Sequence, residues 1–372
     1  MGSAVENPHI SAVIFDLDGT LLNTEDVTKN VLKNFLAKYG KEQDSEKEKK
    51  RLGTTFKESS LTIVSDYDLP LTPEEFVQEI LPMYQGTWLL AKPLPGANRL
   101  MGHLHKHGVP FALASNSLRR NIEGKISHHD GWKERFTMIL GSDQVKSGKP
   151  APDIFQEAAK GMGMESSCCL VIEDSIVGVK AGKAAGMKVV AVPSLQNESD
   201  SYFIADSILH SLLEFQPEQW GLPQFEDWVD DALPTEPIHL TGVFSNGLFQ
   251  EYTDNGSSDL PSQIWGLYIG WVKLDEQKVL KAVISIGWRL GGCGSERTIQ
   301  PCLIDENYVN NSDCEMQLLL VGYLRRSHSA GNMSNGPSIL DEDKLSGDAA
   351  LNLPAFSHKL CDSFFLGECI EN

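Results

Sequence analysis

The sequence predicts an α/β fold: a doubly wound parallel sheet with an inserted helical cap, followed by a smaller, β-rich, barrel-like domain. Three observations support this prediction. Short apolar runs alternate with helical patterns up to about residue 215, a charged helical stretch interrupts them after the first run, and strand-like runs dominate beyond residue 240. The chain has 372 residues, more than one hydrophobic core usually covers, which agrees with two domains.

The first part of the chain alternates strands and helices as a parallel sheet requires. Residues 11–15 form an apolar run, and apolar side chains recur at helical spacing over 24–38. After the break at Pro93-Leu-Pro-Gly96, strands are expected at 109–114, 137–140, 168–172 and 187–192, with helices at 96–107, 117–128, 152–163 and 176–186. Such uniformly apolar strands predict a sheet covered on both faces.

These patterns divide the chain into segments. The expected boundaries are an N-terminal tail (1–10), a parallel-sheet core (11–23 and 93–215), a helical cap (24–92), a proline-rich linker (216–240), a β domain (241–326) and a loose C-terminal tail (327–372). In the cap, Thr72-Pro-Glu-Glu75 predicts a helix start. The prediction of a β domain depends on apolar runs at 264–273, 279–287 and 316–324. The expected tail is rich in Ser, Asn, Gly and acidic residues.

Composition and charge exclude several classes of function. The formal net charge of −19 repels phosphate backbones and anionic lipid, so we expect neither nucleic acid nor a membrane as a partner. The sequence shows no secretory signal and no apolar run long enough for a membrane span. Its seven cysteines lack metal-ligand spacing and are expected to be reduced. We therefore expect a cytoplasmic protein with a small-molecule partner, and the oligomeric state stays open.

Polar side chains gather where the expected parallel strands end. The segments concerned are Asp16-Leu17-Asp18, Ser115-Asn116, Gly148-Lys149-Pro150 and Glu173-Asp174. Ligands of doubly wound sheets bind beyond these strand ends, so we expect the four segments to share one crevice. Carboxylates at this density cannot all stay ionised without a cation, and ligands that are all oxygen favour Mg²⁺.

A cation, a lysine and a hydroxyl together form a phosphate site. One aspartate can attack phosphorus in line and form an aspartyl-phosphate, while the second protonates the leaving oxygen and later takes a proton from water. Each segment alone has another interpretation: a capped turn at Asp18-Gly19-Thr20, a surface lysine at 149, and helix N-terminal acids at 173–174. Their occurrence together favours a phosphatase.

These four motifs, in this order, resemble the haloacid dehalogenase-like phosphatases over about residues 10–215. That family has a Rossmann-like sheet with a helical cap after the first motif. The resemblance implies that Asp16 is the nucleophile and Asp18 the acid/base. It also implies that Lys149 and Ser115 hold the phosphoryl group, with Lys149 counted among the catalytic residues.

The resemblance assigns roles to the remaining motif residues as well. Thr20 is implied to be a substrate-binding residue that also orders the first loop, and Asn116 orients the phosphate or the substrate. Mg²⁺ is implied to bind Asp16, the backbone carbonyl of Asp18 and Asp174. Glu173 is implied to be a further ligand or a supporting acid.

Longer segments resemble the plant bifunctional enzymes that pair an FMN phosphatase with a riboflavin kinase. They are LPGANRL, HGVPFALASNS, NIEGKISHHDGWKERF, LVIEDSIVGVKAGKAAGMKVVAVPSL and WGLPQFEDWV. This resemblance implies hydrolysis of FMN to riboflavin and phosphate, with another sugar phosphate or nucleotide as the alternative substrate. In the cap, Lys57 and Arg51-Leu-Gly53 lie where related caps reach the site, although ordinary surface charge is an equally open interpretation.

The β domain resembles riboflavin kinases over roughly 262–324, in GLYIGWV, KAVISIGW, RTIQP and LLLVGYL, but it departs from them where their chemistry lies. Residues 238–265, which include TGVFSNGLFQEYTDNGSSDL, lack the family's Gly-rich loop and Pro-Thr-Ala-Asn motif. Gln300 replaces the Glu base, and an amide cannot take a proton at neutral pH. Trp288-Arg289 follows Gly287 in place of Asn-Pro, and Glu306-Asn-Tyr-Val309 replaces Asp-Phe-Tyr-Gly. Gly, Ser and Asn stand in place of the family's C-terminal helix.

We therefore expect a Mg²⁺-dependent FMN phosphatase with an inactive kinase-like domain that still folds. Three alternatives stay open. The first is a protein in which both activities survive, and the second is a non-catalytic flavin-binding protein. The third is a sugar-phosphate mutase, which shares the nucleophile and the cap.

Overall fold

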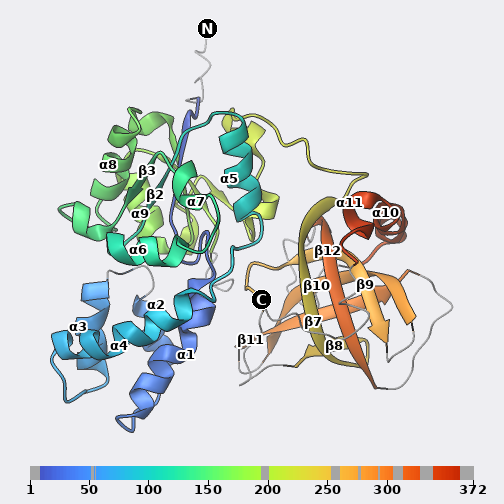
Figure 1. Cartoon of the computed structure of the whole chain (residues 1–372), viewed down its shortest axis with the longest axis horizontal. Helices are drawn as coiled ribbons and strands as arrows, with labels where there is room; N and C mark the ends of the chain where they lie inside the picture. Colours follow the sequence, from blue (N-terminus) through green and yellow to red (C-terminus); the bar gives the residue numbers. More distant parts are fainter. Residues whose placement is uncertain are drawn as a thin grey trace. The chain divides into compact units, whose positions relative to one another are not determined.

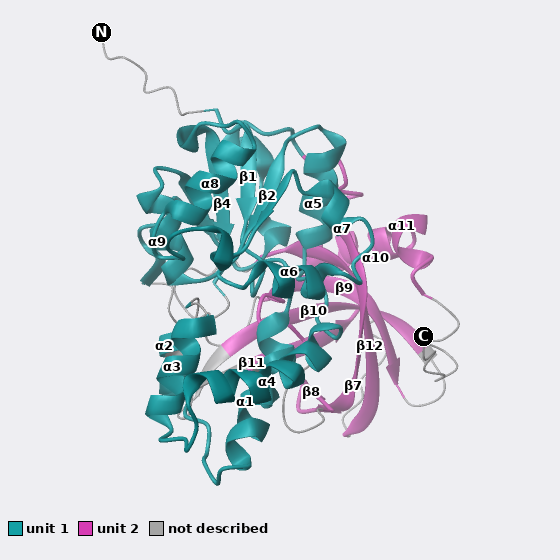
Figure 2. Cartoon of the chain, turned by 60° about the vertical axis from the view of Figure 1, so that its left-hand side comes forward, with its two compact units in different colours: residues 1–224 teal, residues 225–372 magenta. Residues whose placement is uncertain are grey.

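The computed structural model (Figure 1) describes residues 9–51, 54, 56–193, 201–252, 260–274, 278–291, 294–304, 313–326 and 338–360. The chain divides into two compact units, residues 1–224 and 225–372, which Figure 2 colours separately. The division falls inside the segment expected to be a linker. The predicted fold class is confirmed, because a parallel α/β sheet forms the first unit and an antiparallel barrel-like sheet forms the second.

A six-stranded parallel sheet, in the order β3-β2-β1-β4-β5-β6, organises the first unit. Its strands are short: β1 (Ala12–Phe15), β2 (Phe111–Ala114), β3 (Met138–Leu140), β4 (Cys169–Glu173), β5 (Lys188–Ala191) and β6 (Ser207–Ile208). The central strand β1 pairs in parallel with β2 on one side and with β4 on the other. The strand order therefore reverses at β1, and doubly wound sheets bind their ligands at such a point.

Helices cover both faces of this sheet (Figure 1). On one face, α8 (Asp153–Gly161) and α9 (Ile176–Ala184) share a core with Ile14 of β1. Phe15 points to the opposite face, because neighbouring strand residues alternate, and its ring meets Phe111 edge to face at 5.9 Å. Three helices complete this unit's core: α5 (Ala97–Lys106), α6 (Arg119–Ile126) and α7 (Trp132–Arg135). Burial of each aromatic ring stabilises the fold by about 1.5–3 kcal/mol.

Four helices between β1 and β2 occupy the segment expected to be a cap: α1 (Thr24–Ala37), α2 (Ser45–Arg51), α3 (Phe56–Asp66) and α4 (Pro73–Trp88). Side chains from α1, α3 and α4 and the loops beside them form a separate core, in which Phe35 and Phe76 meet edge to face at 5.1 Å. The predicted helix start at Thr72 is confirmed. Its hydroxyl accepts from the Glu75 N–H at 3.2 Å, and the Glu75 carboxylate accepts from the Thr72 N–H at 2.8 Å.

The second unit is a six-stranded antiparallel sheet in the order β11-β10-β9-β12-β7-β8. Its strands are β7 (Leu233–Ser245), β8 (Leu248–Glu251), β9 (Gly266–Leu274), β10 (Lys278–Gly291), β11 (Gly294–Leu303) and β12 (Cys314–Arg325). The end strands β8 and β11 also contact each other, so the sheet curls into a nearly closed barrel. Ile269, Val283 and Leu319 lie in its core.

Two differences from the sequence predictions concern this unit. β7 begins at Leu233, inside the expected linker, although Pro234 and Pro237 argue against a strand. Pro234 is tolerated because it lies opposite Gly322, where the register of β12 shifts. The second difference is that α10 (Asp341–Leu351) and α11 (Pro354–Ser357) form within the expected loose tail.

Contacts with the barrel hold these two helices in place. Both guanidinium contacts from Arg325 of β12 to the Asp343 carboxylate of α10 measure 2.7 Å, and Leu351 and Phe356 are buried in the barrel core. Packing of this kind stabilises a helix whose composition is unfavourable. The prediction that a C-terminal helix is lost is therefore wrong. No helix in the described part of the chain is both long and apolar enough for a membrane span.

Candidate active site

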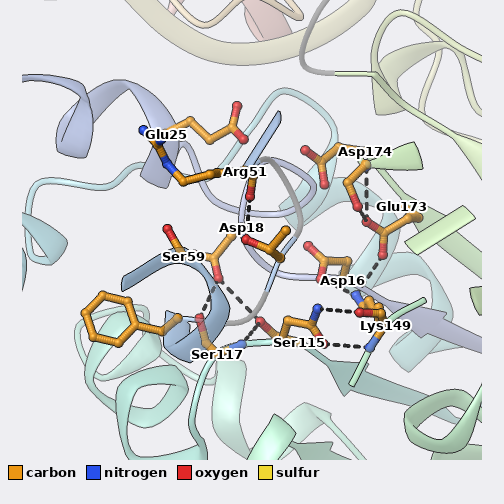
Figure 3. Close-up of a pocket in the computed structure, with 14 residues that line it drawn as sticks. Asp16, Asp18, Glu25, Arg51, Ser59, Ser115, Ser117, Lys149, Glu173 and Asp174 are labelled. Carbon is orange, nitrogen blue, oxygen red and sulfur yellow. Dashed lines mark hydrogen bonds and ion pairs between the residues drawn. The ribbon is translucent and has the colours of Figure 1, made fainter. Parts of the chain in front are cut away.

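One pocket of about 190 Å³ brings the predicted motifs together beyond the ends of β1, β2 and β4 (Figure 3). All predicted site residues except Thr20 line it, namely Asp16, Asp18, Ser115, Asn116, Lys149, Glu173 and Asp174. The cap supplies further lining residues, which are Glu25, Arg51, Thr54, Phe56 and Ser59. The pocket therefore has a highly charged floor from the sheet and a mixed polar and aromatic wall from the cap.

Lys149 lies between two buried acids. Its Nζ donates to Asp16 Oδ1 at 2.5 Å and to Glu173 Oε2 at 2.7 Å (Figure 3). The exposed fraction is only 3% for Lys149 and 1% for Glu173, so water does little to screen these charges. Asn116 fixes the backbone of the lysine, because its side-chain amide donates to the Lys149 carbonyl at 3.2 Å and accepts from the Lys149 N–H at 2.9 Å.

Burial and mutual repulsion shift the pKa values of these groups. Burial raises the pKa of Asp16 to about 8, and the charge of Glu173 adds to this effect while Lys149 opposes it. Burial likewise raises the pKa of Asp174, with Glu25 and Glu173 adding to it. Burial would lower the pKa of Lys149, but the charges of Asp16 and Glu173 outweigh it and raise that pKa. One lysine therefore does not balance the negative charge of the pocket.

Three buried acids form a group that could hold a metal ion. Oxygen atoms of Asp16, Glu173 and Asp174 all lie within 4.8 Å of one another. Such an all-oxygen donor set suits a hard cation of the Mg²⁺ type. Neighbouring groups orient the acids, since the Ser175 hydroxyl donates to Glu173 Oε1 at 2.6 Å and the Thr20 hydroxyl donates to Asp174 Oδ1 at 3.1 Å.

The loop after β1 approaches the acid group closely. Gly19 has φ +83°, and a Cβ at this position would overlap the carboxylate of Asp174. Glycine meets both requirements, the left-handed backbone and the close approach. Thr20 follows it and is buried, with its hydroxyl on Asp174. The structure therefore gives Thr20 a position that supports the acid group rather than one on the pocket wall.

Asp18 lies among four hydrogen-bond donors. Its Oδ1 accepts from the Thr24 hydroxyl at 2.7 Å and from Lys125 Nζ at 2.6 Å. Its Oδ2 accepts from the hydroxyls of Ser117 at 2.9 Å and Ser115 at 3.3 Å (Figure 3). Burial would raise the pKa of Asp18, but the Lys125 charge and these hydrogen bonds outweigh it and lower the pKa. The two aspartates of the first motif therefore lie in opposite electrostatic environments.

Several residues of the site were missed at the sequence level. Ser117 could have been found, because it follows Ser115 by two residues in the same loop. Lys125 and Thr24 give no such signal, since each lies inside a helix pattern. In the cap, Arg51 lines the pocket, Leu52 and Gly53 lie outside the described residues, and the exposed Lys57 is not part of the wall.

Comparison with known proteins identifies a family for each unit. The haloacid dehalogenase-like hydrolase family matches residues 13–192, and the riboflavin kinase family matches residues 253–335. A bifunctional riboflavin kinase/FMN phosphatase from Arabidopsis thaliana is 43% identical over 358 residues, which cover 93% of this chain and 94% of that protein. The (DL)-glycerol-3-phosphatase 2 of the same plant is 38% identical over 228 residues, covering 59% of this chain and 94% of that protein.

Solved structures support the assignment of the first unit. A family IA, variant 3 hydrolase from Entamoeba histolytica aligns with a TM-score of 0.51 at 26% identity, covering 57% of this chain and 98% of that one. CbbY from Rhodobacter sphaeroides, solved with phosphate, aligns with a TM-score of 0.50 at 25% identity, covering 55% and 96%. The chain therefore belongs to the family of bifunctional riboflavin kinase/FMN phosphatases, and its first unit is a haloacid dehalogenase-like phosphatase.

Proposed function

We propose that the first unit hydrolyses FMN to riboflavin and phosphate through an aspartyl-phosphate on Asp16, with Mg²⁺ as cofactor. One observation carries the proposal: Asp16, Asp18, Lys149 and Asp174 line one pocket in a chain that matches the Arabidopsis bifunctional enzyme along nearly its whole length. Lys149 Nζ is already 2.5 Å from the proposed nucleophile, so a phosphoryl group brought to Asp16 would meet a cation there.

The proposed reaction uses residues of this pocket in two steps. Lys149 and the Ser115 hydroxyl hold the phosphoryl group while the Asp16 carboxylate attacks phosphorus. The bond from phosphorus to the ribityl oxygen breaks, and that oxygen takes a proton from Asp18 in the molecules in which this carboxyl is protonated. Water then attacks the aspartyl-phosphate as the Asp18 carboxylate takes its proton. Phosphate leaves and the Asp16 carboxylate is restored.

We assign the metal ligands from the partners that the acids already have. Glu173 uses one oxygen on Lys149 and the other on Ser175, so we assign it the role of positioning the lysine. Asp16, Asp174 and the backbone carbonyl of Asp18 would then hold Mg²⁺. When bound, the ion would neutralise phosphoryl oxygens and favour the ionised form of Asp16.

The size of the pocket bears on the substrate. A volume of about 190 Å³ is below the roughly 300–1,000 Å³ that usually encloses a whole drug-sized ligand. The phosphate and ribityl chain would fill the polar floor, and the isoalloxazine would extend toward the cap. There Phe56 offers an aromatic surface beside Tyr84, with 6.2 Å between the ring centres. The same small volume and polar lining favour a second candidate, a short polyol phosphate.

We infer that the second unit does not transfer phosphate from ATP to riboflavin. Gln300 lies on β11 opposite Ser285 of β10, and its amide cannot replace the glutamate base that the kinase family uses. The two-residue turn Asn246-Gly247, with φ of 52° and 79°, joins β7 directly to β8 in the stretch where kinases carry a Gly-rich loop. Residues 253–259 and 306–309 lie outside the described residues and add nothing to this argument.

Phosphate release from FMN by the purified protein with Mg²⁺ tests the main proposal. A panel of polyol, sugar and nucleotide monophosphates and the Asp16→Asn variant would be measured in parallel. Preference for FMN, lost in the variant, is the expected result. Release from polyol phosphates with none from FMN would replace FMN by the second candidate. Release that persists in Asp16→Asn would refute the nucleophile assignment.

A further inference from the structure

We propose that Lys125 is a positioning residue for the proton-transferring carboxylate of Asp18 and that it couples this carboxylate to the cap through Trp88. The inference rests on the proposed function, because it concerns the acid step of the same reaction. Lys125 lies on α6 of the core and is outside the group of acids that could hold a metal.

The side chain of Lys125 is buried and directed at the site. Its exposed fraction is 7%, and its Nζ donates to Asp18 Oδ1 at 2.6 Å and to the Ser117 hydroxyl at 3.0 Å. A buried ammonium is costly unless it is paired and hydrogen-bonded. Both partners of this one line the active-site pocket, and Ser117 in turn donates to Asp18 Oδ2 at 2.9 Å. Lys125 therefore contacts one oxygen of the Asp18 carboxylate directly and the other oxygen through the Ser117 hydroxyl.

The same ammonium contacts the end of the cap. Lys125 Nζ lies 5.2 Å from the ring centre of Trp88, the last residue of α4, in the range of a cation–π interaction. The neighbouring Gly124 lies so close to this ring that a Cβ there would be 3.6 Å from it. α6 therefore packs directly against the indole, just before the chain returns from the cap to the core.

The other connection between cap and core reaches Asp18 as well. Thr24, the first residue of α1, donates to Asp18 Oδ1 at 2.7 Å, the oxygen that also accepts from Lys125. The segment that enters the cap thus contacts the Asp18 carboxylate through the Thr24 hydroxyl. The segment that leaves the cap contacts it indirectly, because Trp88 packs against Lys125. A movement of the cap about these two connections would change both sets of contacts together.

Positioning of Asp18 affects catalysis because proton transfer requires one of its oxygens within hydrogen-bond reach of the ester oxygen. Lys125 limits the positions that the carboxylate adopts. Without the lysine, Asp18 keeps the three hydroxyl donors but loses its only ion-pair partner among the described residues. We expect it to spend less time oriented toward the leaving group, so the acid step slows while phosphorus itself is attacked as before.

Comparison of two leaving groups tests this inference. The ribityl alkoxide needs a proton as it leaves, whereas p-nitrophenolate is a weak base that leaves without one. Lys125→Met should lower kcat/KM for FMN by about 10- to 100-fold, part of the roughly 10²–10⁴-fold that general acid–base catalysis supplies. For p-nitrophenyl phosphate it should change kcat/KM by less than about threefold. If the wild-type protein prefers polyol phosphates, glycerol phosphate is used instead of FMN as the alkyl ester in this comparison.

Two further variants separate this inference from the proposed function. Asp18→Asn should also lower kcat/KM for FMN more than for p-nitrophenyl phosphate. Equal losses for the two esters in Asp18→Asn would refute the assignment of Asp18 as the acid. Suppose that Asp18→Asn slows FMN hydrolysis more than p-nitrophenyl phosphate hydrolysis. If Lys125→Met then slows both hydrolyses equally, or slows neither of them, Lys125 does not position the acid. Lys133→Met, on an exposed side chain of α7, is the matched control and should leave both rates unchanged.

A folding defect would not leave the question open. Thermal unfolding of Lys125→Met shows whether the variant is folded. If it is not, Ser117→Ala removes the hydroxyl that bridges Lys125 and Asp18 without emptying a buried charge site. It should slow FMN hydrolysis more than p-nitrophenyl phosphate hydrolysis. An equal effect on both substrates would overturn the inference.

Discussion

Nζ of Lys149 lies 2.5 Å from Oδ1 of Asp16, and both side chains are almost completely buried. The lysine also bonds to Glu173 at 2.7 Å, so one ammonium pairs with two carboxyl groups in the floor of the pocket. This arrangement links stability to activity. The Lys149 ammonium that would bind a phosphoryl group also stabilises the buried acids of the folded protein when no phosphoryl group is bound.

Removal of this ammonium should therefore harm both properties. We expect Lys149→Met to lower the free energy of unfolding by about 3–5 kcal/mol in metal-free protein, because it leaves two buried carboxylates without their cation. Phosphate release should fall for every monoester, whatever its leaving group. Urea unfolding and phosphate assays measure the two effects. The matched control, Lys160→Met, removes a lysine that is 78% exposed, and a similar loss of stability there would contradict the argument.

The raised pKa of Asp16 predicts how pH acts on metal-free protein. Its pKa of about 8, against an ordinary 3.8, means that the folded state keeps a proton that the unfolded state has lost between these values. Stability should therefore fall as pH rises from about 4 to about 8. The proposed Mg²⁺ ion would bind the ionised carboxylate, so the rise in Tm that it causes should be larger at about pH 8 than at about pH 6.

Thermal unfolding with and without Mg²⁺ at these two pH values checks the prediction. Asp16→Asn should weaken the pH dependence of the Mg²⁺ effect, because an amide carries no titrating proton. A larger Mg²⁺ effect at the lower pH would show that the acid group does not bind the ion as proposed.

The close approach of Gly19 to Asp174 gives a second test of the proposed metal site. Gly19→Ala places a Cβ against the Asp174 carboxylate and on a backbone with φ +83°. We expect the affinity for Mg²⁺ to fall by about 10- to 100-fold, as for losses of metal-supporting contacts in general. Gly40→Ala is the matched control, since Gly40 has φ +67° with open space around it. Equal losses of Mg²⁺ affinity in both variants would show that the effect comes from the left-handed backbone conformation and not from the contact with Asp174.

Phe56 should contribute to recognition of an aromatic leaving group. Phe56→Ala removes an aromatic side chain from the cap wall and should raise KM for FMN by about tenfold, as for a lost stacking contact of roughly 1–1.5 kcal/mol. KM for glycerol phosphate should stay the same, because that substrate has no ring. Steady-state kinetics of the adjacent Lys57→Ala variant provide the control. A rise in KM for both substrates would argue against contact with the flavin ring.

The kinase-like unit should form no FMN from riboflavin and ATP with Mg²⁺. Gln300→Glu alone should not restore the activity, because the tight Asn246-Gly247 turn remains. Product analysis in a chain carrying Asp16→Asn keeps the phosphatase from consuming any FMN that forms. Detection of FMN from the chain with Gln300 intact would refute the inference of an inactive kinase.

The sequence alone determined much of this protein. The motif Asp16-Leu17-Asp18 follows an uninterrupted apolar run, and a strand with that pattern has to be buried with its polar end at the sheet edge. The same local argument placed Ser115 and Glu173-Asp174. Local patterns failed at β7, where prolines hid a strand that a register shift accommodates, and at α10, which depends on packing against the barrel.

Tertiary structure decided which of these groups interact. Asp18 and Lys125 are 107 residues apart in the chain, and no pattern around Lys125 distinguishes it from a lysine on the outer face of a helix. Its burial against Trp88 and its 2.6 Å contact with Asp18 arise because the cap leaves and rejoins the core beside α6. The chemistry of the motifs is thus encoded locally. The partners that position each carboxylate depend on distances through space, which the fold alone sets.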